Sequence, residues 1–217
     1  EGLFLSSGVV RNADYTMERL VRVAKELRLT HRYNGYIHLK AIPGASAELM
    51  AEAGLYADRL NVNIEIPTEE NLKLLAPEKD YHSVLAPMGF IHQRFLESKE
   101  EKRKYRNAPR YAPAGQSTQM VIGATPESDQ QILSLASSLY RQPSMKRVYY
   151  SGYIPVNNDS RLPALSAPPL VRENRLYQSD WLMRFYQFKV DEIVNEAHPN
   201  LDLDIDPKLS YALRHPE

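Results

Sequence analysis

Cysteine is absent from the 217-residue sequence, which excludes disulfides, thiolate metal ligands and cysteine nucleophiles within these residues. Net charge is absent as well, because 27 basic side chains balance 27 acidic ones. This balance argues against a strong non-specific binder of nucleic acid or of membrane surfaces, although it leaves room for a local basic patch.

Long apolar runs and familiar catalytic motifs are missing too. No run is long enough to cross a bilayer and no signal peptide opens the chain, so we expect a cytoplasmic protein with no membrane partner. There is no glycine-rich phosphate loop and no G-x-S-x-G elbow, and the six histidines show no close metal-ligand spacing. We therefore predict no metal ligand among these residues. The chain begins inside an apolar run and ends directly after a helical pattern, so we expect an internal piece of a longer protein.

Hydrophobic periodicity and turn residues predict alternating strands and helices, which implies a parallel sheet with helical crossovers. The expected strands are residues 2–5, 36–40, 60–67, 116–123 and 148–154. The expected helices are 16–29, 46–53, one starting after Thr68, 90–106, 128–140, 171–185, 190–197 and a last turn from Asp206. The expected N-caps are Asp14 or Thr16, Ser46, Thr68, Ser128 and Asp206, and Gly54 is expected to end the second helix.

Residues 60–67 form the most unusual strand, because two asparagines and Glu65 alternate strictly with apolar residues. An antiparallel strand with one solvent-exposed face would explain this pattern, and so would a barrel strand with a site at its carboxyl end. Polar faces recur on the strands at 36–40 and 148–154. A curved sheet that encloses a ligand explains three such strands better than a doubly wound sheet does.

The residues at the ends of these strands suit an amino acid joined to a nucleoside. The Glu65 carboxylate can accept hydrogen bonds from vicinal hydroxyls, and Asn63 can donate and accept beside it. The hydroxyls and carbonyls of residues 6–8 suit an ammonium group. Gly123 permits a flat ring to approach the backbone, and Tyr153 could stack on that ring.

Several of these stretches resemble those of radical S-adenosylmethionine (SAM) enzymes: the first strand with its S-S-G, the N-x-E strand, and Q-M-V-I-G-A-T-P-E at residues 119–127. The resemblance implies an α/β fold, a partial (β/α)6 TIM-like barrel without its first β/α unit, over residues 1–155. A proline-rich connection and C-terminal helices would follow over residues 156–217. The resemblance also implies binding roles: Ser6, Ser7 and Gly8 for the methionine amino group, Asn63 and Glu65 for the ribose, and Ile122 and Gly123 for the adenine. We add His38, for which a structural role is an equal alternative.

More narrowly, blocks such as F-L-S-S-G-V, Y-N-G-Y-I-H-L-K-A-I-P-G-A and N-L-D-L-D-I-D-P-K-L are similar to DNA modification/repair radical SAM proteins. This implies an iron–sulfur enzyme that acts on DNA or nucleotides through a 5′-deoxyadenosyl radical, with SAM, a [4Fe–4S] cluster and a reductant protein. In that family pattern the C-x-x-x-C-x-x-C loop would precede Glu1 and a DNA-binding helix-hairpin-helix would follow Glu217. We therefore expect this piece to be inactive alone.

Four residues are candidates for the substrate side: Lys40, Asn61, Gln119 and Tyr153, each of which could equally be structural. Two other hypotheses stay open. A TIM-barrel lyase or aldolase would use Lys40 to form a Schiff base. A non-catalytic nucleic-acid-binding module would bind with steep salt dependence. The run S-K-E-E-K-R-K in the helix at 90–106 is either a solvated face or a phosphate contact.

Overall fold

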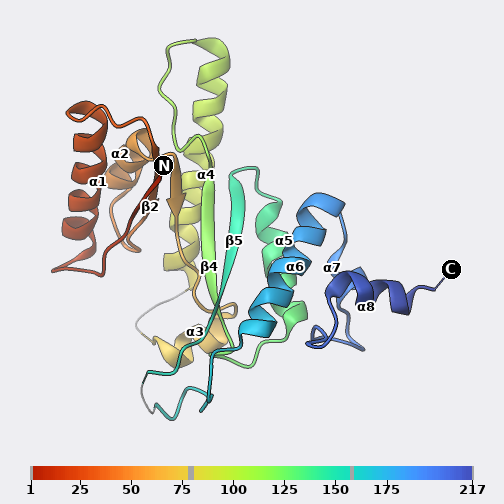
Figure 1. Cartoon of the computed structure of the whole chain (residues 1–217). Helices are drawn as coiled ribbons and strands as arrows, with labels where there is room; N and C mark the ends of the chain where they lie inside the picture. The colour runs from red at the N-terminus through yellow and green to blue at the C-terminus, as the bar shows by residue number, and fades with distance from the viewer. Residues whose placement is uncertain (1, 78–80, 157–158, 217) are drawn as a thin grey trace. The chain divides into compact units, whose positions relative to one another are not determined.

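The computed structural model describes residues 2–77, 81–156 and 159–216. One sheet has the order β1-β2-β3-β4-β5, and strands β1 to β4 pair in parallel (Figure 1). The strands are β1 (Gly2–Leu5), β2 (Tyr36–Lys40), β3 (Arg59–Asn61), β4 (Gln116–Ile122) and β5 (Met145–Gly152). The α/β class and the parallel sheet are therefore confirmed. Closure into a barrel stays a prediction.

Helices connect the strands in the predicted alternation. They are α1 (Ala13–Leu29), α2 (Ala47–Tyr56), α3 (Glu69–Leu75), α4 (Tyr81–Lys104), α5 (Asp129–Tyr140), α6 (Leu170–Tyr186), α7 (Val190–Ile193) and α8 (Pro207–Arg214). In the part of the chain that the structure describes, no helix is both long and apolar enough to span a membrane.

The chain forms two compact units, which are described separately. Unit 1 comprises Glu1–Ile64, Lys79–Thr118 and Gln142–Arg147, and unit 2 comprises Glu65–Glu78, Gln119–Arg141 and Val148–Glu217. Strands β4 and β5 contribute residues to both units, as their bounds show.

In unit 1, the buried face of α1 packs against α2, and apolar residues of β2 and β3 complete the core. Because β2 alternates, Ile37 and Leu39 are fully buried while Tyr36 on the other face is exposed. The first helix begins earlier than predicted. Its N-cap is Asn12, whose side chain accepts a hydrogen bond from the Tyr15 amide, so neither Asp14 nor Thr16 is the cap.

Gly54 does not end α2 as predicted but lies inside it. A Cβ at this position would fall 2.1 Å from the Tyr111 ring, so the glycine makes room for that ring. Tyr111 belongs to the segment that follows α4 and runs back toward β4 (Figure 1). Its amide donates to the Ser98 hydroxyl at 3.0 Å, which ties this returning segment to the helix. Helix α4 itself begins nine residues before the predicted 90–106 range, and Pro87 lies inside it.

In unit 2, helices α5 and α6 pack together around a buried carboxylate. The fully buried Asp180 accepts a hydrogen bond from the Tyr140 hydroxyl at 2.6 Å and pairs with Arg184 at 2.7 Å. The Tyr140 oxygen in turn accepts the Val148 amide of β5, which joins both helices to the sheet. Burial and the neighbouring Asp180 carboxylate raise the pKa of Tyr140, so its hydroxyl keeps the proton that it donates.

Helix starts in unit 2 follow the predicted capping residues in part. Ser128 and Gln131 form a capping box at the start of α5, and Asp206 caps α8. At α3, Thr68 occupies the N-cap position, but its side chain accepts no amide of the helix, and its hydroxyl donates to Glu127 instead. In unit 1, Ser46 likewise occupies the N-cap position of α2 without a side-chain cap. Helix α7 ends at Ile193, four residues before the predicted end.

Candidate functional site

The predicted central strand is shorter than its sequence pattern indicates, and its asparagines are buried. Strand β3 ends at Asn61, and the Ile64 amide bonds to the Thr118 side chain where a strand would pair backbone with backbone. Asn61 is 4% exposed and Asn63 is 8% exposed. The prediction of a regular strand over residues 60–67 is therefore wrong, because the ladder is interrupted at Ile64. Backbone pairing with β4 persists on both sides, from the Val62 amide to Ser117 O and at the Glu65–Met120 bridge.

A chain of polar contacts links four side chains of unit 1. The Ser117 hydroxyl donates to Asn61 Oδ1 at 3.1 Å, and Asn61 Nδ2 donates to Asn63 Oδ1. His38 Nε2 lies 3.0 Å from the same Ser117 oxygen. A hydroxyl has one proton, which Ser117 gives to Asn61, so His38 must donate its Nε2–H to Ser117. The contacts fix a single tautomer for His38.

His38 is suited to this role because it stays neutral. Burial, followed by the positive charge of Arg59, lowers the pKa of His38 to about 4. The Phe4 ring packs edge-on against the imidazole, with 4.9 Å between ring centroids. The residue is therefore an uncharged hydrogen-bond donor at neutral pH.

Glu65 has an uncommon backbone conformation. Its φ is +64°, in the left-handed region that costs a non-glycine residue about 1–2 kcal/mol. The conformation is held from both sides, since the Glu65 amide donates to Gln119 O at 3.0 Å and its carbonyl accepts the Val121 amide at 2.7 Å. Strain of this kind, held in place by surrounding structure, is typical of functional positions.

The loop after β1 leaves its polar groups close to solvent. Ser6 and Gly8 are exposed, Ser7 is half-buried, and the Ser7 hydroxyl donates to the Gly8 carbonyl at 2.7 Å. A Cβ at Gly8 would meet no atom within 4 Å. Packing therefore does not require glycine at this position.

Ile122 ends β4 and Gly123 follows it, both in unit 2. Ile122 is fully buried, and its carbonyl accepts the Tyr153 amide at 2.8 Å. Gly123 has φ +85°, and a Cβ there would lie 3.0 Å from Pro169 Cγ. Glycine at 123 is therefore required both by its backbone conformation and by contact with Pro169.

The predicted substrate residues differ in their surroundings. Lys40, Gln119 and Tyr153 are partly exposed, and Lys40 stands opposite Asn61 in the β2–β3 register. Asn61 is buried and hydrogen-bonded to Asn63 and Ser117, as a structural residue would be. The substrate role of all four stays a prediction, as does the Schiff-base hypothesis for Lys40.

Two residues of the polar chain and its surroundings were not singled out from the sequence: Ser117 and Thr118. Ser117 lies two residues before Gln119 on β4 and so on the same face of that strand. The same alternation that pointed to Gln119 could have found Ser117. Nothing local marks Thr118, whose role depends on the distant Ile64 amide.

The residues of this chain do not fit an iron–sulfur cluster. Clusters of this kind are held by cysteine thiolates, which the sequence lacks. Within residues 2–77, 81–156 and 159–216 there is also no group of three or more His, Asp or Glu side chains that could hold a metal ion.

A hollow of about 380 Å³ lies in unit 2. The residues that line it come later in the sequence than all of the predicted site residues. Its lining comes from α7, α8 and the segment between them, and includes Ile193, His198, Leu201, Pro207 and Arg214. Arg214 donates to the carbonyls of Glu192 and Ile193 and so ties α8 to the end of α7. None of the predicted site residues lines this hollow.

No protein-family model matches this sequence, and no curated protein matches it. Among solved structures, the chain is similar to coproporphyrinogen III oxidase (HemN) from Escherichia coli, which is described as a radical SAM enzyme. The two are 12% identical, with a TM-score of 0.45, and the similarity covers 79% of this chain. The chain spans only 37% of the length of that protein. A similarity at this level assigns neither family nor activity.

Proposed function

We propose that this chain binds S-adenosylmethionine and is part of a radical SAM enzyme. The observation that carries the proposal is the backbone of Glu65. Glycine would adopt its left-handed conformation without strain, yet the position holds a carboxylate. A strained acid two residues after a buried carboxamide is best explained by a ligand that needs the acid.

The roles follow the chemistry of each group. Asn63 and Glu65, two residues apart along the chain, would bind the ribose hydroxyls, since an ionised carboxylate only accepts hydrogen bonds. The exposed polar groups of residues 6–8 would bind the methionine ammonium. The backbone at Gly123 would lie along the adenine. A neutral His38 would avoid repulsion of the positively charged sulfonium.

The finer function belongs to the whole protein. The family resemblance implies a cluster that supplies an electron to SAM, a reductant protein, and DNA or a nucleotide as the substrate. The cluster ligands would come from outside this sequence, because these residues do not fit a cluster. The role that we propose for this chain within the whole enzyme is to bind and orient the adenosyl group.

Calorimetry with adenosine and 2′-deoxyadenosine tests the ribose contact directly. The wild-type chain should bind adenosine at least about 10-fold more tightly, because a charge-assisted hydrogen bond contributes about 1.5–3 kcal/mol. Glu65→Gly should lose most of this preference, because it removes the carboxylate and leaves only Asn63 to contact the ribose; it also relieves the backbone strain. Glu69→Gln is the matched control, since Glu69 is an exposed acid of the nearby α3. It should keep the wild-type preference.

Two results would contradict the proposal. One is the absence of saturable binding of both adenosine and SAM at millimolar concentration. The other is a preference for adenosine that survives unchanged in Glu65→Gly. A loss of binding in Glu69→Gln equal to that in Glu65→Gly would show an effect of charge alone, and it would also overturn the assigned ribose contact.

A further inference from the structure

A basic surface lies at the end of α4 in unit 1. Between residues 99 and 110 the chain carries six basic side chains and only the acids Glu100 and Glu101. The whole chain has no net charge, so this excess is local. The basic residues are Lys99, Lys102, Arg103, Lys104, Arg106 and Arg110.

One of these cations has a structural task. The Lys102 ammonium donates to the carbonyls of Arg106 and Ala108 and so closes the turn after α4. Lys99, Arg103 and Lys104 are exposed, as are Arg106 and Arg110. The turn is therefore held by one lysine, while the other five cations face solvent.

A second segment brings another cation to this surface. The ammonium of Lys146 at the start of β5 and that of Lys99 both approach the buried Phe95 ring, at 6.0 and 4.5 Å from its centroid. In the described part of the chain, neither ammonium has an ion-pair partner. Burial, followed by the positive charges of Lys99 and Arg59, lowers the pKa of Lys146. An anion bound here would relieve this repulsion.

An exposed aromatic ring lies within the basic run. Tyr105 directly follows Lys104, precedes Arg106, and is 69% exposed. Because most of the ring is exposed, its face is accessible for stacking. Aromatic rings between cations are typical of surfaces that bind single-stranded nucleic acid, where bases stack on the rings and the cations contact phosphates. An acidic protein partner would use the cations but would not need the ring.

We propose that the surface formed by Lys99, Arg103, Lys104, Tyr105, Arg106 and Lys146 binds a single strand of nucleic acid. The cations contact the phosphates, and Tyr105 stacks on a base. This inference does not depend on SAM binding, because it uses none of the residues proposed for SAM.

Fluorescence anisotropy with labelled oligo(dT) of about 20 nucleotides tests the surface, since single-strand sites span up to about 16 nucleotides. Each phosphate contact contributes about −0.7 to the slope of log K against log salt, so Lys99→Ala/Lys146→Ala should flatten the slope by about 1.4. At 0.1 M salt this corresponds to about 25-fold weaker binding. Tyr105→Ala should weaken binding at least about 5-fold and leave the slope unchanged.

Arg19→Ala/Arg22→Ala is the matched control, because it removes two exposed cations from α1 of the same unit. It should bind oligo(dT) like the wild type. All variants should bind adenosine like the wild type, so a failure here is distinguishable from a failure of SAM binding.

Three outcomes would overturn the proposal. The first is no binding of oligo(dT) at 50 mM salt. The second is an equal loss of affinity in the α1 control and in Lys99→Ala/Lys146→Ala. The third is competition by polyglutamate as strong as that by unlabelled oligo(dT), which would assign the surface to an acidic protein.

Discussion

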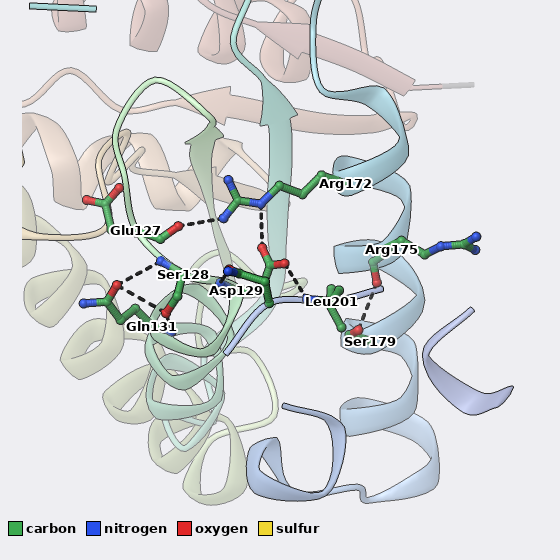
Figure 2. A network of polar contacts seen from close by, with 9 residues as sticks. Glu127, Ser128, Asp129, Gln131, Arg172, Arg175, Ser179 and Leu201 are labelled. Atoms are coloured by element: carbon green, nitrogen blue, oxygen red, sulfur yellow. Dashed lines mark hydrogen bonds and ion pairs between the residues drawn. The ribbon is translucent and has the colours of Figure 1, made fainter. Parts of the chain in front are cut away.

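Replacing Asp129 with alanine should destabilise unit 2 by about 3 kcal/mol. The Asp129 side chain is 1% exposed and accepts two hydrogen bonds, from Arg172 Nε at 2.7 Å and from the Leu201 amide at 2.8 Å (Figure 2). Arg172 also donates to the Glu127 carbonyl at 2.6 Å. One carboxylate thus joins the start of α5 to α6 and to the segment before α8.

Two estimates of the loss agree. Removing one partner of a buried ion pair costs about 3–5 kcal/mol, because the other charge stays buried without its partner. Two hydrogen bonds to a charged group, at about 1.5–3 kcal/mol each, give about 3–6 kcal/mol. The Arg172 side chain is 21% exposed, so water partly replaces the lost carboxylate and the lower end applies.

Urea unfolding and hydrogen exchange measure the effect. In Asp129→Ala, exchange should become faster at the Leu201 amide and at the start of α6, while α1 and α2 keep their protection. Asp129→Asn keeps one acceptor oxygen and should lose less stability. Glu69→Ala removes one partner of an exposed ion pair with Lys73 and should change stability by no more than about 0.5 kcal/mol.

A loss below about 1 kcal/mol in Asp129→Ala would refute this reasoning. So would unchanged exchange at Leu201. Either result would mean that the carboxylate does not hold these three segments together.

Two other substitutions test the packing and the polar chain of unit 1. Gly54→Ala should destabilise the protein by about 1–3 kcal/mol, because the new Cβ would overlap the Tyr111 ring; an unchanged thermal midpoint would contradict this. His38 should titrate near pH 4 in an NMR titration of its ring, well below its ordinary pKa of 6.5. The unfolded chain therefore binds more protons between pH 6.5 and 4, so stability should fall as the pH is lowered through this window. His38→Gln should lose less stability than the wild type over this window, and a ring that titrates near 6.5 would disprove the argument.

The sequence predicted a helix start correctly where the capping residue and the amides that it accepts lie close together in the chain. Ser128 caps α5 as predicted, and the structure adds Gln131, three residues on, as its partner in a capping box. Asp206 followed by proline likewise marks the start of α8. These features could be predicted because both partners of each hydrogen bond lie within one helical turn.

The predicted end of α2 and the predicted strand over residues 60–67 were wrong because contacts with distant residues decide the structure there. Gly54 has the residue type of a helix end, but the Tyr111 ring, far along the chain, packs on it inside α2. The alternation of residues 60–67 predicted the apolar burial correctly, since Leu60, Val62 and Ile64 are all buried. It could not predict that the Thr118 side chain would replace a backbone partner after Asn61.

In the candidate site, too, the local sequence pattern was predictive and the effects of distant residues were not. Alternation placed His38, Asn61 and Asn63 on polar faces of neighbouring strands, and the structure links them through Ser117. The positive φ of Glu65 could not be predicted, because glutamate has no preference for that conformation. It arises from the two backbone hydrogen bonds to β4.

Pro169 touches the ends of two strands at once. It lies 3.0 Å from a Cβ built at Gly123 and 3.3 Å from one built at Gly152. Three positions far apart in the sequence therefore share one small volume, and a larger side chain at either glycine requires Pro169 to shift. Related sequences should change these positions together or not at all, and a mutational library that varies them one at a time would miss the functional combinations.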